Sequence, residues 1–396
     1  MDCITETSTL NTAFSCDVCV AGGGVAGIAA ALSAARNGAD VILLEKEFIL
    51  GGLATAGLIT IYLPLDDGEG TQVSFGIAEE LLKLSIQYGA EAKYPKAWLE
   101  NGSFEEKKSG PRFEVQFNPH LFAISAEQLL LKEGVRILYG TSVCGVQKDG
   151  GRIPQVIIEN KSGRQGISVR TVVDATGDAD VCHLAGENTA EFQQGNLLAG
   201  WYYYVNEKGL SLRQLGASDV PEEYKAQQNS PKPLIDRRFK GLDGAELSEM
   251  VCLSHGQILD DILKRRKNGE TLVPVTIPTI PQIRMTRRIC GMYTMDDKEI
   301  RKDFADSCGM FSDWRKRGPS YQLPFGTLHG EKVENLIAAG RCISVTDSMW
   351  DITRVIPVCA VSGEAAGTAA AMTDNFKTLD ISKLQSTLKE KGVHIK

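Results

Sequence analysis

A glycine-rich loop near the start of the chain constrains its fold more than any other feature. Glycines 22, 24 and 27 follow the spacing G-x-G-x-x-G, between an apolar run and an alanine-rich run. In such a loop Gly22 permits a tight turn, Gly24 leaves room for a pyrophosphate, and Gly27 lets a helix pack closely on a sheet. Glu45 ends the next apolar run, where a carboxylate can accept hydrogen bonds from ribose hydroxyls. The sequence therefore predicts a dinucleotide site with no preference yet among NAD, NADP and FAD.

Composition excludes several classes of protein. The formal charge of −7 argues against nucleic acid as a partner. The chain contains no apolar run approaching the ~18 residues that a membrane span requires. The segment Met1–Phe14 carries no basic stretch followed by an apolar one, so no secretory signal is visible. We expect a cytoplasmic protein without nucleic-acid or membrane partners.

The pair Cys16-x-x-Cys19 has the spacing of a metal or redox motif. It falls inside the predicted first strand, where positions three apart point to opposite faces. No second Cys-x-x-Cys completes a zinc set. We therefore expect small buried side chains here, and no metal site.

The order of predicted elements indicates an α/β protein. The first unit reads as strand, helix and strand over residues 16–21, 26–37 and 40–45. Later patterns predict further helices over 75–89 and 119–133, strands over 135–138, 141–146, 155–159 and 170–174, a strand over 335–339, and an alanine-rich helix through Met372. The middle of the chain, about 186–324, holds most of the prolines and several aromatic clusters, and is too long for a structureless loop.

Four segments together resemble the FAD-dependent oxidoreductases of the glutathione-reductase-like fold, near the fumarate reductase and succinate dehydrogenase flavoproteins. The first couples the glycine loop to Glu45 and then to the pair Gly51-Gly52 with Thr55. The others are the strand around Val143, the run Val172-Val173-Asp174-Ala175-Thr176-Gly177-Asp178, and residues 335–341 followed by 354–359. The resemblance covers roughly the first 85 residues, 112–190, and 280 to the end.

The resemblance implies a Rossmann-like FAD-binding domain, three-layered around a mostly parallel sheet, with an inserted α+β substrate domain. We assign residues 1–85, 112–190 and 325–396 to FAD binding, and 86–111 and 191–324 to the substrate or cap domain. FAD would be bound non-covalently, since no histidine lies in the first glycine-rich segment. The implied cofactor-binding residues are Gly22, Gly24, Val25, Ala26, Gly27, Glu45, Lys46, Gly51, Gly52, Leu53, Thr55, Val143, Ala175, Thr176, Gly177, Gly340, Arg341, Val355 and Ile356.

The last segment departs from many relatives at one position. Where they have an aspartate that binds the ribityl chain, this chain has Arg341. That hydrogen bond is in doubt, and the arginine could contact phosphate instead. Residues 353–358 resemble the start of the helix that is aimed at the flavin pyrimidine edge. Its amides would stabilise the negative charge of the reduced cofactor.

Candidates for the substrate site are arginines. Arg284, Arg287 and Arg288 are spaced so that on a helix they would share one face. Guanidinium groups at that spacing can bind a carboxylate with paired hydrogen bonds. The alternative is a solvated or salt-bridged helix face. Arg354, beside the presumed flavin helix, is a second anchor, so the predicted catalytic residues are Arg354, Arg288 and Arg287.

The resemblance implies hydride transfer between flavin N5 and a small organic substrate, and the arginines extend this expectation to a carboxylated substrate. The electron donor or acceptor and the oligomeric state are left open. No second G-x-G-x-x-G appears, so a separate NAD(P)H domain is not expected. Two alternatives remain: an FAD enzyme without net redox chemistry, of the hydratase, isomerase or tRNA-modifying type, and a catalytically silent FAD-binding protein.

Overall fold

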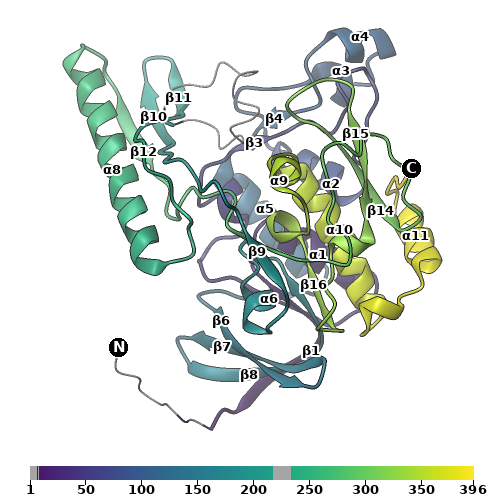
Figure 1. Cartoon of the computed structure of the whole chain (residues 1–396). Coiled ribbons are helices and arrows are strands. Elements are labelled where there is room, and N and C mark those ends of the chain that lie inside the picture. The colour runs from purple at the N-terminus through teal and green to yellow at the C-terminus, as the bar shows by residue number, and fades with distance from the viewer. Residues whose placement is uncertain (1–6, 8, 217–232) are drawn as a thin grey trace.

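The centre of the molecule is a seven-stranded, mostly parallel sheet (Figure 1). The computed structural model describes residue 7 and residues 9–216 and 233–396. Strands follow the order β5-β2-β1-β8-β7-β6, and β16 pairs with the end of β8. The parallel strands are β1 (Thr12–Ala21), β2 (Val41–Leu44), β5 (Arg136–Leu138), β8 (Gly163–Asp174) and β16 (Leu336–Ala338). An antiparallel hairpin, β6 (Ser142–Asp149) and β7 (Arg152–Asn160), completes the sheet.

The predicted α/β class and the opening strand–helix–strand unit are confirmed. Helix α1 (Val25–Arg36) joins β1 to β2, which lie side by side in parallel. β1 begins four residues before the predicted start at residue 16, because its first half pairs with the first half of β8. That pairing joins segments about 150 residues apart in the chain, which local periodicity does not reveal.

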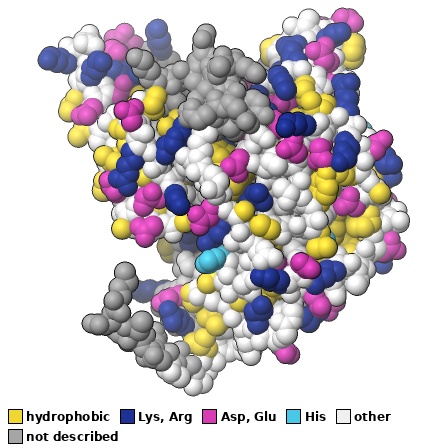
Figure 2. All heavy atoms as spheres, in the orientation of Figure 1, with side chains coloured by type: hydrophobic (Ala, Val, Ile, Leu, Met, Phe, Trp, Pro, Cys, Tyr) yellow, Lys and Arg dark blue, Asp and Glu magenta, His cyan; other side chains and the backbone are white. Residues whose placement is uncertain are grey.

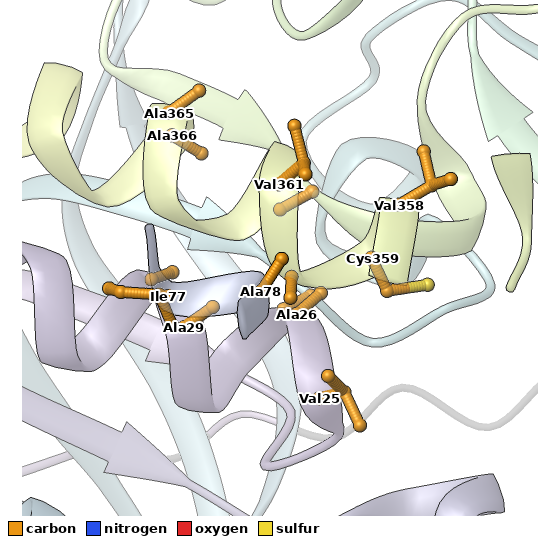
Figure 3. Packing of buried hydrophobic residues seen from close by; sticks show 14 of the residues in the cluster. Val25, Ala26, Ala29, Ile77, Ala78, Val358, Cys359, Val361, Ala365 and Ala366 are labelled. Atoms are coloured by element: carbon orange, nitrogen blue, oxygen red, sulfur yellow. The ribbon is translucent and has the colours of Figure 1, made fainter. Parts of the chain in front are cut away.

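Helices α1 and α10 (Ile356–Met372) pack together on one face of the sheet (Figure 3). Their close approach depends on two glycines. A Cβ at Gly363 would lie 2.3 Å from the carbonyl oxygen of Ala26, and one at Gly367 would lie 2.1 Å from that of Ala30. Helices α2 (Ile77–Ser85) and α5 (Pro119–Lys132) complete this layer. The alanine-rich composition of both long helices therefore serves their contact.

The opposite face of the sheet has a core of its own. It contains Cys19 of β1 and the buried side chains Val181 and Cys182 of the short helix α6 (Asp180–Leu184). Cys16 and Cys19 are both buried and form no disulfide, as expected of small core residues. Cys3 lies outside the described residues.

A second, smaller sheet lies to one side of the molecule, next to the longest helix (Figure 1). Strands β11 (Gly209–Arg213), β10 (Tyr202–Asn206) and β12 (Val273–Thr276) form it, and α8 (Gly244–Lys267) packs on it through Ile258 and Ile262. The other α-helices and strands among the described residues are β3 (Ile61–Tyr62), α3 (Lys96–Leu99), α4 (Phe104–Ser109), β4 (Val115–Gln116), β9 (Thr189–Glu191), β13 (Arg287–Ile289), β14 (Ser307–Ser312), β15 (Ser320–Pro324), α9 (Asp347–Thr353) and α11 (Ile381–Glu390).

No single helix in the described part of the chain has the length and apolar character needed to cross a membrane. Helices α9 and α10 satisfy that test only when taken together, and they are bent by 91° at their junction. Of the segment Met1–Phe14, in which the sequence shows no secretory signal, residues 1–6 and 8 lie outside the described residues. On the face in Figure 2, acidic and basic side chains are interspersed.

Helix α10 carries a buried carboxylate into the core. Glu364 is 4% exposed, and its Oε2 accepts a hydrogen bond of 2.8 Å from the backbone N–H of Ile77, the first residue of α2. Burial raises the pKa of Glu364 from 4.5 to about 8, although the bond from Ile77 lowers it. The folded protein therefore binds this proton more tightly than the unfolded chain does.

We expect a Glu364→Gln variant to flatten the pH dependence of stability. A raised folded pKa contributes stability below the unfolded pKa, and this contribution is lost as pH rises through the folded value. The free energy of unfolding of the parent should thus fall between about pH 5 and about pH 8, and the variant should gain about 3 kcal/mol relative to the parent across that window. Urea unfolding at several pH values measures this. Glu105→Gln, at an exposed position of α4, is the matched control, and equal pH slopes for all three proteins would contradict the expectation.

Candidate functional site

One cavity gathers most of the residues predicted to bind FAD. It lies at the carboxyl ends of β1, β2 and β8, where parallel α/β sheets bind ligands. Arg354 lines it as well. The predicted cofactor residues along its wall are Gly22, Gly24, Val25, Ala26, Glu45, Lys46, Gly51, Gly52, Leu53, Val143, Ala175, Thr176, Gly177, Arg341, Val355 and Ile356.

Two of the three loop glycines are required by the backbone. Gly22 has φ +102°, and a Cβ there would lie 2.5 Å from the carbonyl oxygen of Ala175. A Cβ at Gly27 would lie 1.8 Å from the carbonyl oxygen of Gly22. Gly27 does not line the cavity, so its role is to bring α1 close to the turn.

Gly24 differs from both, because a Cβ there would meet no atom within 4 Å. It lines the cavity and caps α1, whose first turn has no side-chain cap and no acidic residue. The N–H groups of that turn are therefore free to bind an anion, and the helix dipole favours one. Open space beside uncapped amides fits a pyrophosphate.

The second glycine pair lies directly against this loop. The N–H of Gly51 donates to the carbonyl oxygen of Gly23 at 2.8 Å, and a Cβ on Gly52 would lie 3.3 Å from Cα of Gly24. Thr55 is buried away from the cavity, and its hydroxyl donates to the carbonyl oxygen of Leu50. Thr55 was predicted to contact the cofactor, but it does not line the cavity and instead stabilises the turn at Leu50–Gly52.

Glu45 joins the loop to the end of β2. Its Oε2 accepts from the N–H of Gly23 at 2.8 Å, and its Oε1 accepts from the N–H of Glu47 at 2.8 Å. Burial raises the pKa of this carboxyl, while the two backbone N–H groups lower it. Each carboxylate oxygen can accept more than one hydrogen bond, so two ribose hydroxyls can still be bound.

Arg341 links two segments of the chain, which the sequence did not reveal. Its Nη1 donates to the carbonyl oxygens of Ile283 at 3.2 Å and Arg284 at 2.9 Å, and its Nη2 lies 3.3 Å from Oδ1 of Asp178. The guanidinium therefore links the turn after β8 to the segment 283–284. Arg341 also lines the cavity, and its contact with phosphate stays a prediction. Gly340 has φ +81° and does not line the cavity.

The prediction that Arg284, Arg287 and Arg288 share a helix face is wrong. Arg287 and Arg288 lie on strand β13, paired with β9, so their side chains point to opposite faces. Arg287 donates to Oδ1 of Asp180 at 2.7 Å, and Arg288 lies 5.9 Å from the ring centre of Trp350. Neither lines the cavity, whereas Arg284 does. Arg287 and Arg288 are therefore not retained as site residues.

Arg354 belongs to a buried ion network. Its Nε and Nη2 donate to Oδ1 of Asp351 at 3.1 and 2.5 Å. The other oxygen of Asp351 lies 3.5 Å from Nη1 of Arg315, which also pairs with Asp313. Asp351 and Asp313 are fully buried, and the two arginine side chains are 10% and 6% exposed. Two carboxylates and two guanidinium groups thus form the buried part of this network, which holds Arg354 at the cavity wall. The exposed Lys316 also pairs with Asp313, at 4.0 Å.

Sequence reasoning missed the apolar end of the cavity. Its wall there consists of aliphatic side chains that follow the second glycine pair or lie between β12 and β13, namely Ile59, Ile61, Leu63, Ile280, Pro281 and Ile283. Their only sequence signal was an apolar composition that core residues share. Two histidines that lie near the cofactor segments in the sequence are not part of the cavity wall: His183 is exposed, and His329 is buried elsewhere.

The family model described as FAD dependent oxidoreductase matches residues 17–200 and 222–388. The chain belongs to this family. FAD is therefore its cofactor, and the cavity, with its uncapped helix α1 and buried Glu45, fits that molecule.

Two curated relatives match over short stretches. A thioredoxin reductase of Ureaplasma parvum is 34% identical over 76 residues, which are 19% of this chain and 25% of that protein. A vinyl phenol reductase of Lactiplantibacillus plantarum is 38% identical over 86 residues, 21% of this chain and 17% of that protein. The chain thus spans a quarter or less of the length of either relative. A solved flavocytochrome c3 fumarate reductase has a TM-score of 0.43 and 15% identity, over 91% of this chain and 79% of that one.

Proposed function

We propose that the protein is a dehydrogenase or reductase that acts on a small organic molecule at the apolar end of its cavity. One observation carries this proposal: the cofactor segments and the aliphatic wall line a single cavity, so a substrate can lie against the cofactor. Both curated relatives are named reductases, which supports the same class of reaction. When bound, FAD supplies a hydride acceptor or donor.

The chain's own contribution is binding and electrostatics. Helix α10 begins at Ile356 after Val355, with no side-chain cap and no acidic residue in its first turn. Both residues line the cavity, so the positive end of this helix favours the negative charge that reduction adds to the cofactor. Dithiol chemistry is not part of the proposal, because Cys359 alone among the described cysteines lines the cavity.

The test is anaerobic titration of the purified holoprotein with candidate organic substrates. Bleaching of the flavin's visible absorption, with turnover on adding an electron acceptor, is the expected result. Product formation while the flavin stays oxidised would replace the proposal with a non-redox FAD enzyme. Failure of every substrate, and of reduced acceptor dyes, to exchange electrons with the flavin would leave a silent FAD-binding protein.

A further inference from the structure

The aliphatic end of the cavity has the properties of a chamber for a second molecule. Of its six side chains, Ile283 alone is buried, and the other five are partly exposed. They come from segments 59–63 and 280–283, which contain none of the predicted FAD-binding residues. We call these six residues the apolar chamber. Partly exposed aliphatic groups that converge on one cavity favour a ligand that removes their surface from water.

The two walls of the apolar chamber are fixed to one another. The N–H of Thr279 donates to the carbonyl oxygen of Ala56 at 2.9 Å, and Nε2 of Gln282 donates to that of Gly57. At its other end the segment receives the two hydrogen bonds of Arg341 on residues 283 and 284. The segment 279–284 is therefore held at both ends, and the chamber is preformed.

Three arginines, Arg284, Arg341 and Arg354, line the cavity that contains the apolar chamber. Nε and Nη2 of Arg354 are occupied by Asp351. Among the residues that the structure describes, none hydrogen-bonds to Nη1 of Arg354. Because Asp351 already balances the charge of this arginine, a ligand needs only an oxygen that accepts a hydrogen bond from Nη1.

We infer that the substrate has an apolar hydrocarbon body, which fills the apolar chamber, and one hydrogen-bond-accepting oxygen group, which Nη1 of Arg354 binds. A small, highly charged dicarboxylate does not match such a wall. The ligand is a substrate only if the proposed function holds, but its binding is measurable without turnover.

The experiment titrates holoprotein with hexanoate, octanoate, octanamide and succinate, followed by calorimetry and by perturbation of the flavin spectrum. Each buried methylene should strengthen binding about fourfold, so octanoate should bind about 15-fold more tightly than hexanoate. Octanoate and octanamide separate a carboxylate from a neutral carbonyl as the bound group. Affinity independent of chain length, or tighter binding of succinate than of octanoate, would overturn the inference.

Two variants locate the ligand. Ile61→Ser should weaken octanoate binding about tenfold while FAD content stays unchanged. The control Ile300→Ser, at an exposed position outside the cavity wall, should alter neither. Arg354→Lys keeps a cation beside Asp351 but removes the Nη1 donor of the guanidinium group. The affinity for octanoate, for octanamide or for both should therefore fall. If Ile61→Ser lowers FAD content and leaves octanoate affinity intact, the chamber serves the cofactor and the inference fails.

These outcomes are distinguishable from failure of the proposed function. Chain-length-dependent binding without any bleaching of the flavin would support the apolar chamber and contradict the redox reaction. Bleaching by a substrate whose affinity is unchanged in Ile61→Ser would support the redox reaction and contradict the chamber.

Discussion

A Gly24→Val variant is expected to fold normally and to bind FAD at least about 100-fold more weakly than the parent. The backbone of Gly24 has φ −66° and ψ 179°, a conformation that valine adopts without strain, and a Cβ there meets no protein atom within 4 Å. The added side chain instead enters the cavity where the phosphates approach α1. Overlap between the valine side chain and the bound phosphates costs about 3 kcal/mol, which corresponds to a loss of FAD affinity of about 100-fold.

Flavin content and calorimetric titration of apoprotein with FAD measure this effect. Gly244→Val is the matched control, because a Cβ at Gly244 also meets nothing within 4 Å and the residue lies outside the cavity wall. It should retain FAD. Full flavin occupancy in soluble Gly24→Val protein would contradict the position assigned to the pyrophosphate.

The second large effect concerns the ion network behind Arg354. Asp351→Ala should lower the free energy of unfolding by about 3–5 kcal/mol, because it leaves two buried guanidinium groups with one carboxylate between them. Asp351→Asn keeps the shape and one acceptor oxygen, and should cost less than alanine. Denaturant unfolding of the holoprotein gives both values.

An exposed ion pair supplies the comparison. Lys96 and Glu100 lie 3.7 Å apart with side chains 79% and 49% exposed, so Glu100→Ala should change stability by less than about 1 kcal/mol. If Asp351→Ala costs no more than Glu100→Ala, the network does not carry the energy assigned to it. If the alanine variant fails to fold, the asparagine variant decides, since it must still be less stable than the parent.

The sequence predicted the parts of the cavity whose conformation is local. Gly22 and Gly177 follow the ends of β1 and β8, as the sequence predicted, and both have positive φ in the structure. The family resemblance assigned Gly51 and Gly52 to the cofactor site, and the bridge of Gly51 to Gly24 places this pair against the first glycine loop. Contact of these residues with FAD stays a prediction.

Long-range contacts were beyond the sequence. The spacing of Arg284, Arg287 and Arg288 fits a helix, yet strand β9 pairs with 287–289 and determines their conformation from about 100 residues away. The charge balance of Arg354 depends on Arg315 and Asp313, which no motif connects to it. The apolar chamber likewise arises only when segments 59–63 and 280–283 come together.

The contact of α1 with α10 also determines when the protein can acquire its cofactor. Glu45 and the glycine loop emerge from a ribosome before β16 and the start of α10, which lie about 290 residues or more beyond Glu45. Until they emerge, the small side chains of α1 that α10 covers face water, and the cavity lacks the wall formed by Val355 and Ile356. A nascent chain therefore cannot hold FAD through these contacts until Val355, Ile356 and the rest of α10 have been synthesised.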